Sequence, residues 1–286
     1  MTVLAYLPTR LLQQLRFVLG NERAPLIANT WGELEPLLQV NPVSVAVIDP
    51  SELPSGKATQ LEQLMATYPS LPVIAYVPLT PLAFKTITQL AQTGMRHVVL
   101  YSIDDEATRF LALIAQVQTN PLTARLINAL GPRLARLPLS LTKSVETLFA
   151  EPHLFPNAQD IGTMSTIPLV RVHRVLREAG LATPKKLFIA AKLLKAYSYL
   201  GDPGHSVQAV AKKLGYRHRR ILSDHSHELF NLNPSRLHAY MTEDEVLHRI
   251  LTFVGREGET HSVVSGTTLQ IPRIVPPHHS TAHRVR

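Results

Sequence analysis

The sequence predicts an α/β domain at the N-terminus, followed by an all-helical domain. Three observations lead to this fold class. Five short apolar runs alternate with amphipathic stretches up to about residue 120, helical patterns follow, and the charge changes sign between the two regions. The chain has 286 residues, of which 45% are hydrophobic and 17% are charged. This length and composition are typical of a globular protein with two cores.

The five apolar runs are short enough for buried strands, and an amphipathic stretch follows each of them. The predicted strands lie at residues 3–7, 25–30, 43–49, 72–79 and 97–103, and the predicted helices at 10–20, 31–39, 60–68, 83–94 and 107–117. Helix exits and strand entries are marked by Pro25, Pro42, Pro72 and Gly94. Strands that alternate with helices predict a parallel sheet with helices on both faces, in the order (βα)₅.

A helical connector is predicted over residues 120–150, with two helical stretches separated by Leu137 and Pro138. One apolar stripe runs along the first stretch, because leucines recur there at spacings of three and four residues. Packing of this stripe against the rest of the chain is the simpler interpretation, and a dimer contact is the alternative. The leucines of the stripe are Leu126, Leu130, Leu134 and Leu137.

A helix, a tight turn and a second helix are predicted over residues 211–234, which read AKKLGYRHRRILSDHSHELFNLNP. Gly215 suits the turn, because a residue without Cβ adopts the left-handed backbone at low cost. Leu222, Leu229 and Phe230 supply an apolar side that anchors the second helix. This spacing is typical of a helix-turn-helix, whose second helix enters the major groove of DNA.

Long polar donors gather on the other side of the predicted second helix. Arg219 and Arg220 are the candidates for base contacts, because guanidinium groups match the O6 and N7 acceptors of guanine. Asp224 follows Arg220 by four residues, a spacing at which the carboxylate can orient the guanidinium. The candidate DNA-binding residues of this unit are Arg217, His218, Arg219, Arg220 and Ser223.

A weaker version of the same pattern lies upstream, at residues 160–184. Pro168 suits a helix start, since proline is tolerated in a first turn, and Gly180 ends the helix. A longer helix after Pro184 would join the two units into a tandem. The candidate DNA-binding residues here are Arg171, His173 and Arg174, with Lys185 and Lys186 as phosphate contacts.

The excess of basic residues is confined to the region of these two units. Residues 1–120 hold 7 Lys or Arg against 9 Asp or Glu, whereas residues 121–254 hold 18 against 10. Phosphates respond to local rather than average charge, so this distribution favours a polyanion bound to the second region. A solvated basic surface is the alternative.

Residues from about 140 to 240 resemble the DNA-binding domain of AraC/XylS-type transcription regulators. The resemblance implies two helix-turn-helix units, joined by a long helix, with their recognition helices in adjacent major-groove segments. Four positions depart from the family pattern: Asn231 replaces a glycine, Ser226 a large buried aromatic residue, Gly162 an alanine and Ser165 an apolar residue. The loss of the aromatic residue implies a repacked core or a lower stability. The best matches to the family's positions are Ala211, Leu214, Gly215, Tyr216, Leu222, Phe230 and Pro234.

The (βα)₅ order resembles the receiver domain of bacterial response regulators, which implies a flavodoxin-like strand order. In that family, phosphorylation needs an acidic pair after the first strand, an aspartate after the third, Ser or Thr after the fourth and Lys after the fifth. Asp49 alone matches, since Leu7-Pro8, Val77-Pro78 and Tyr101-Ser102 occupy the other positions. One carboxylate is a poor magnesium site, so we interpret the domain as a pseudo-receiver and Asp49 as a strand-end residue before a turn.

Two alternatives remain for this first domain. Asp49 is a candidate phosphoacceptor, and the crevice beyond the carboxyl ends of the strands is a candidate site for a small ligand, as in other open α/β sheets. Neither GxGxxG nor GxxxxGK[ST] occurs in the chain, so no phosphate loop supports a nucleotide there.

Several signatures of catalytic and cofactor sites are missing from the sequence. It contains no cysteine and no HEXXH motif, and His225 and His227 face different ways on a helix. We therefore expect no enzyme activity, no cofactor and no metal. No apolar run approaches the length that spans a bilayer, and the N-terminus lacks a signal pattern, so we expect a cytoplasmic protein without a membrane partner.

Together these patterns predict a pseudo-receiver domain at residues 1–119, a helical connector at 120–150, a tandem helix-turn-helix domain at 151–254 and a disordered tail at 255–286. We expect a transcription regulator that binds double-stranded DNA sequence-specifically, with a homodimer through the receiver-like domain or the connector as a further expectation. The effector is not specified. The alternatives are a protein-docking module with a degenerate helix-turn-helix, and a response regulator that depends on phosphorylation of Asp49.

Overall fold

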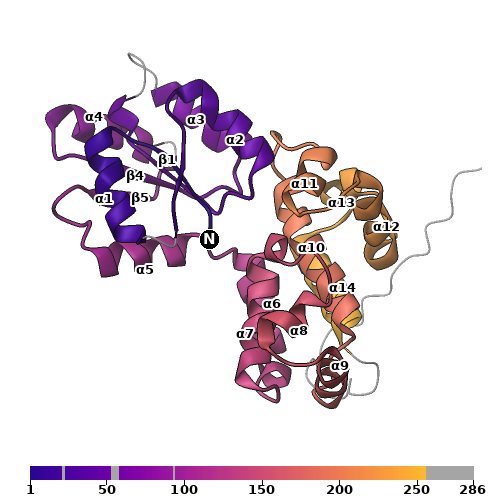
Figure 1. The fold of residues 1–286 in the computed structure, drawn as a ribbon. Helices are drawn as coiled ribbons and strands as arrows, with labels where there is room; N and C mark the ends of the chain where they lie inside the picture. Colours follow the sequence, from indigo (N-terminus) through magenta and orange to yellow (C-terminus); the bar gives the residue numbers. More distant parts are fainter. Residues whose placement is uncertain (21–22, 53–57, 93, 256–286) are drawn as a thin grey trace, which may run out of the picture. The chain divides into compact units, whose positions relative to one another are not determined.

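The computed structural model describes residues 1–20, 23–52, 58–92 and 94–255 (Figure 1). Residues 1–256 form one compact unit, and the predicted disordered tail lies outside the described residues from residue 256 onward. Below, the α/β part denotes residues 1–117 and the helical part residues 121–254. No helix in the described segments is long and apolar enough to cross a membrane.

The α/β part contains a five-stranded parallel sheet with the strand order β2-β1-β3-β4-β5. This is the flavodoxin-like order, so the prediction is confirmed. Each strand lies within its predicted apolar run, although β2 is only two residues long. The strands are β1 (Val3–Tyr6), β2 (Leu26–Ile27), β3 (Val45–Ile48), β4 (Val73–Val77) and β5 (His97–Leu100).

Helices cover both faces of this sheet, because side chains alternate between the faces along each buried strand. Val45 and Val47 pack with α1 and α5, whereas Ala46 and Ile48 pack with α2, α3 and α4. Short 3₁₀ turns lie after β2, at Trp31–Glu33, and after β3, at Pro50–Glu52. The helices are α1 (Thr9–Leu19), α2 (Leu34–Val40), α3 (Ala58–Thr67), α4 (Pro81–Ala91) and α5 (Ala107–Val117).

The helical part shares one hydrophobic core, with α10 at its centre. Helix α10 is apolar around almost its whole circumference, as expected of a helix that neighbours surround. It contacts α7, α9, α11, α12, α13 and α14. The helices are α6 (Pro121–Leu134), α7 (Leu139–Ala150), α8 (Asp160–Ser165), α9 (Leu169–Glu178), α10 (Pro184–Leu200), α11 (Val207–Lys213), α12 (Arg219–Phe230), α13 (Leu237–Tyr240) and α14 (Glu243–Val254), with 3₁₀ turns at Pro152–Leu154 and Pro234–Arg236.

The leucine stripe of the predicted connector is buried in this same core. Leu126 and Leu130 are fully buried, and α6 packs against α7 and α14. The stripe therefore packs against the chain's own helices, which is the simpler interpretation, and a homodimer through the connector stays a prediction. The predicted domain boundaries, after residues 119, 150 and 254, stay a prediction.

Candidate DNA-binding surface

Helices α11 and α12 are joined by a tight turn at the position where the sequence predicts one. Helix α11 ends at Lys213, and Gly215 has a φ of 75°, in the left-handed region that favours glycine. Helix α12 begins at Arg219 and ends at Phe230, and the next residue, Asn231, has a φ of 55°, which is also left-handed. Asparagine tolerates this conformation better than most side chains, which explains how it replaces a glycine here.

A buried lysine of α10 donates a hydrogen bond to this turn. The Lys192 ammonium group donates a hydrogen bond of 2.6 Å to the Leu214 carbonyl oxygen, one of the carbonyls that the end of α11 leaves free. It also lies 4.5 Å from the centre of the Phe188 ring and 5.0 Å from that of Tyr216. Burial lowers the pKa of Lys192 to about 8. Sequence analysis missed this residue, although its position in the apolar helix α10 was a signal of burial.

The inner face of α12 is well anchored. Leu222 and Phe230 are buried, and so is Ser226, whose hydroxyl donates a hydrogen bond of 2.7 Å to the Leu232 carbonyl. The serine thus meets backbone where the family has an aromatic ring. At the end of α12, Arg249 Nη1 donates a hydrogen bond of 2.8 Å to the Phe230 carbonyl, which satisfies another terminal acceptor.

The outer face carries the predicted donors. Arg219 and Arg220 lie in the first turn of α12, and all four basic residues from position 217 to 220 are exposed. Arg217 and His218 belong to the turn before the helix rather than to the helix itself. This corrects the expectation that the second helix carries Arg217. The first turn of α12 has no acidic residue and no side-chain cap, so its free N–H groups and its dipole favour an anion.

Asp224 and Ser223 make polar contacts on this face. Arg220 Nε lies 4.0 Å from Asp224 Oδ2, so the carboxylate is placed to orient the guanidinium as predicted. Both side chains are strongly exposed, so this pair contributes little to stability. The Ser223 hydroxyl donates a hydrogen bond of 3.3 Å to the Arg219 carbonyl, which turns it partly toward its own helix.

Helices α8 and α9 form a similar pair with different turn chemistry. The left-handed residue is Thr166, with a φ of 56°, rather than a glycine. Gly162 is required by close packing, because a Cβ there would lie 2.9 Å from the Ile167 carbonyl oxygen. Ser165 is buried and donates a hydrogen bond of 3.1 Å to the Gly162 carbonyl. Both departures from the family pattern therefore have a local structural reason.

Helix α9 is strongly amphipathic. Val172 and Leu176 are buried, whereas Arg171, His173 and Arg174 are exposed. Arg174 Nε lies 3.8 Å from Glu178 Oε1, an exposed pair one turn along the helix. The predicted face of α9 thus carries its donors as the sequence indicates.

The predicted phosphate contacts lie at the start of α10. Lys185 and Lys186 are exposed, and the Lys186 ammonium group lies 4.8 Å from the centre of the Phe253 ring. Helix α10 contacts both α9 and α12. The long helix therefore links the two candidate faces within one core.

Not every basic residue of the helical part belongs to a surface. Lys192 and Lys213 are almost fully buried, and burial lowers the pKa of both, and of Lys195. Part of the positive charge of this region is therefore buried and unavailable to a surface ligand. Net charge along the sequence does not make this distinction.

Histidines 225 and 227 have protein partners. His225 Nδ1 lies 2.9 Å from the Tyr216 hydroxyl, and His227 Nε2 lies 2.9 Å from Asn233 Oδ1. Within the described part of the chain, no group of three His, Asp or Glu side chains is arranged to hold a metal ion.

Asp49 lies at the end of β3, with its side chain only 1% exposed. The Ser51 backbone N–H and hydroxyl donate hydrogen bonds of 2.8 and 2.6 Å to its Oδ1 oxygen. At the same edge of the sheet, Arg10 Nε donates a hydrogen bond of 3.1 Å to the Tyr101 hydroxyl. A phosphoacceptor role for Asp49 stays a prediction.

Comparisons with known proteins add little to these observations. No protein-family model and no curated protein matches the sequence. Among solved structures, the chain is similar to full-length FixJ from B. japonicum, with 14% sequence identity, a TM-score of 0.35, and coverage of 81% of this chain and 98% of that chain. A similarity this weak carries no functional argument, so the proposals below rest on the chain's own residues.

Proposed function

We propose that this protein is a transcription regulator of AraC/XylS type that binds double-stranded DNA sequence-specifically. Helices α9 and α12 would be the recognition helices of two helix-turn-helix units. The observation that carries the proposal is the exposed basic cluster at residues 217–220, at the uncapped N-terminus of a helix whose opposite face is buried. This combination presents donors to a groove while the core holds the helix in place.

The two kinds of donor have different roles in this proposal. Arg219 and Arg220 contact base edges, because a guanidinium binds guanine O6 and N7 with two hydrogen bonds. Lys185, Lys186 and the free N–H groups of α12 contact phosphates, which position the protein and make its affinity salt-dependent. Arg171, His173 and Arg174 contact bases from α9.

The α/β part would act as a pseudo-receiver, which regulates or assembles the DNA-binding part without phosphorylation. The burial of Asp49 and its hydrogen bonds to Ser51 support this proposal. So does Tyr101, which stands where the receiver family has its lysine and accepts a hydrogen bond from Arg10. A homodimer through this part is a further proposal.

Selection of bound sites from random DNA, followed by affinity measurements on the recovered site, tests the DNA-binding proposal. We expect Arg220→Ala to lower affinity by about 1–3 kcal/mol and to relax preference at one base pair. Arg109→Ala is a matched control, because Arg109 is an exposed arginine of α5 outside the proposed surface. Recovery of no preferred sequence would contradict the proposal and favour the protein-docking alternative.

The pseudo-receiver proposal has a separate test. The native protein and Asp49→Asn are incubated with a small phosphodonor and magnesium, and their intact masses are measured. We expect neither protein to gain a phosphate. A phosphate on the native protein that is lost in Asp49→Asn would establish the phosphorylation-dependent alternative.

A further inference from the structure

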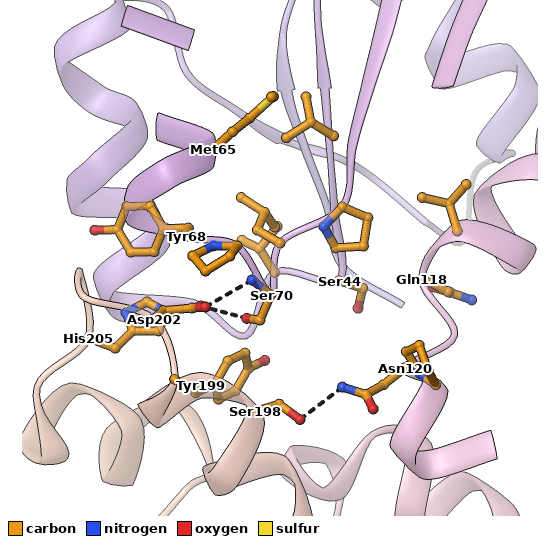
Figure 2. A pocket seen from close by; sticks show the side chains of 18 of the residues that line it. Ser44, Met65, Tyr68, Ser70, Gln118, Asn120, Ser198, Tyr199, Asp202 and His205 are labelled. Carbon is orange, nitrogen blue, oxygen red and sulfur yellow. Dashed lines mark hydrogen bonds and ion pairs between the residues drawn. The ribbon is translucent and has the colours of Figure 1, made fainter. Parts of the chain in front are cut away.

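A cavity of about 860 Å³ lies where the α/β part faces α10 and α11 (Figure 2). Its lining includes Ser44, Val73 and His97, which precede or begin strands β3, β4 and β5. The cavity is therefore at the amino ends of these strands, whereas Asp49 is at the carboxyl end. The sequence-based alternative placed a ligand at the other edge of the sheet, so this cavity is a different site. Its volume is in the range of small-molecule sites.

Hydrogen bonds from both sides hold the wall of the cavity together. The Ser70 backbone N–H and hydroxyl donate hydrogen bonds of 2.9 and 2.5 Å to the carboxylate of Asp202 (Figure 2). The Gly204 N–H donates a hydrogen bond of 3.1 Å to the Thr67 carbonyl, and the rings of Tyr68 and His205 lie 4.9 Å apart. These contacts join the segment after α3 to the loop between α10 and α11.

The cavity has two chemically different sides. Apolar side chains from α2, α3 and the strand entries gather on one side, together with Glu62, Arg96 and His97, and polar and charged side chains from α10, α11 and their connecting loop, Asp202 among them, lie on the other. The apolar group is Leu38, Val43, Met65, Leu71 and Val73, and the polar group is Lys195, Ser198, Tyr199, His205 and Lys213. A ligand with one charged end and an apolar body matches this division.

Two ammonium groups converge on one aromatic ring at the polar side. The Lys195 and Lys213 ammonium groups lie 5.1 and 4.8 Å from the centre of the Tyr199 ring. Lys213 Nζ also lies 2.7 Å from His205 Nε2. Among the described residues, no carboxylate lies within ion-pair distance of either ammonium group, although Asp202 is near enough to act against the lowering of the pKa of both lysines.

Lys213 is buried and Lys195 is half-buried, and neither has an anionic group in contact among the described residues. Burial lowers the pKa of Lys195 and brings that of Lys213 to about 7, since the charged form loses its hydration there. His205 Nδ1 is buried and has no hydrogen-bond partner among the described residues. An anion that enters the cavity would supply the missing charge and restore the polar contacts.

We propose that this cavity binds a small organic anion with an apolar body. Lys195 and Lys213 hold its acidic head beside Tyr199, and Met65, Val43 and Leu71 contact its body. The proposal is independent of DNA binding, because it involves none of the residues assigned to the DNA-binding surface.

Isothermal titration calorimetry of the full chain with octanoate tests the proposal. Octanol and octylammonium serve as neutral and cationic ligands with the same apolar body, and acetate serves as an acidic head without it. We expect octanoate to bind at least roughly tenfold more tightly than octanol and octylammonium, because only a carboxylate accepts charge-assisted hydrogen bonds from the two lysines. We expect the same margin over acetate, because acetate lacks the apolar body. Octanol that binds as tightly as octanoate would overturn the assignment of the lysines.

Three variants locate the site. Lys213→Met is expected to weaken octanoate binding roughly tenfold or more, whereas Lys212→Met is the matched control because the neighbouring Lys212 is exposed and outside the cavity. Met65→Trp narrows the apolar side of the cavity without changing any charge and is expected to weaken octanoate binding. Circular dichroism establishes that each variant folds. The proposal is overturned if the native chain does not bind octanoate, or if folded Lys213→Met and Met65→Trp both bind like the native chain.

Discussion

The Lys192 ammonium group donates a hydrogen bond to the Leu214 carbonyl oxygen over 2.6 Å, directly beneath the turn that leads into α12. Lys192 is almost fully buried, so the ammonium group is isolated from water in the core of the helical part. A residue of the central helix therefore supports the turn at Gly215, and through it the position of the proposed recognition helix.

The first prediction concerns this hydrogen bond. Lys192→Met keeps much of the side-chain volume but leaves the Leu214 carbonyl without its donor. We expect the free energy of unfolding to fall by about 1–3 kcal/mol, the cost of an unsatisfied buried acceptor. Urea unfolding followed by circular dichroism measures the effect, with Lys185→Met as an exposed control on the same helix. A Lys192→Met protein as stable as the control would show that the hydrogen bond contributes nothing.

The second prediction concerns the pH dependence of stability. The pKa values of Lys213 and Lys192 are lowered to about 7 and about 8, whereas an unfolded chain has the ordinary lysine value of 10.5. Between these values the unfolded state binds more protons than the folded state, so stability rises as the pH rises. We expect urea midpoints to increase from pH 7 to about pH 9.5.

A lysine variant separates this effect from other titrations. Lys213→Met removes one of the two groups, so its stability should rise less steeply over the same pH range than that of the native protein. Lys212→Met should keep the native slope. Identical slopes for all three proteins would contradict the assignment of the effect to Lys213.

The third prediction tests the close approach of Gly204 to Tyr68. A Cβ on Gly204 would lie 2.5 Å from two atoms of the Tyr68 ring. Gly204→Ala should therefore lower the free energy of unfolding by about 1–3 kcal/mol, as other overpacked substitutions do. Tyr68→Leu combined with Gly204→Ala should cost less than the sum of the two single changes, because the smaller side chain relieves the part of the clash that involves the ring, while the contact with Thr67 at 2.7 Å remains. Additive costs would show that the ring and residue 204 do not interact.

The fourth prediction concerns Ser226, where the AraC/XylS-type domains that this sequence resembles have a large aromatic residue. The serine is fully buried, and its hydroxyl is bonded to the Leu232 carbonyl. Ser226→Phe should destabilise the protein by about 1–3 kcal/mol, because the ring has to displace well-packed neighbours. Thermal unfolding measures this, with Ser226→Ala as the variant that removes only the hydroxyl. A stabilised Ser226→Phe protein would indicate an unfilled space beneath α12.

Local sequence patterns predicted much of the fold. The five strands fall within the predicted apolar runs because each run is bounded by helical patterns and by proline or glycine. The left-handed turns at Gly215 and Asn231 agree with their residue types, because glycine and asparagine adopt a positive φ more easily than other residues. Periodicity also separated Val172 and Leu176 from the arginines of α9.

Contacts between residues far apart in the sequence could not be predicted from these local patterns. The leucine stripe of α6 predicts a buried face, yet only the tertiary structure decides that α7 and α14 cover it rather than a second chain. Ser226 and Gly162 departed from the family pattern, and their reasons lie in the backbone groups that approach them.

By itself, the sequence determined the alternation of strands and helices, the turns and the exposed faces of α9 and α12, because these depend on neighbours within a few residues. Only the tertiary structure decided which lysines are exposed and which are buried. Lys185 and Lys192 are both cations of α10, but one meets solvent near the helix start and the other meets Leu214, 22 residues away along the chain. The cavity beside Lys195 and Lys213 arises in the same way, since its walls come from segments far apart in the sequence.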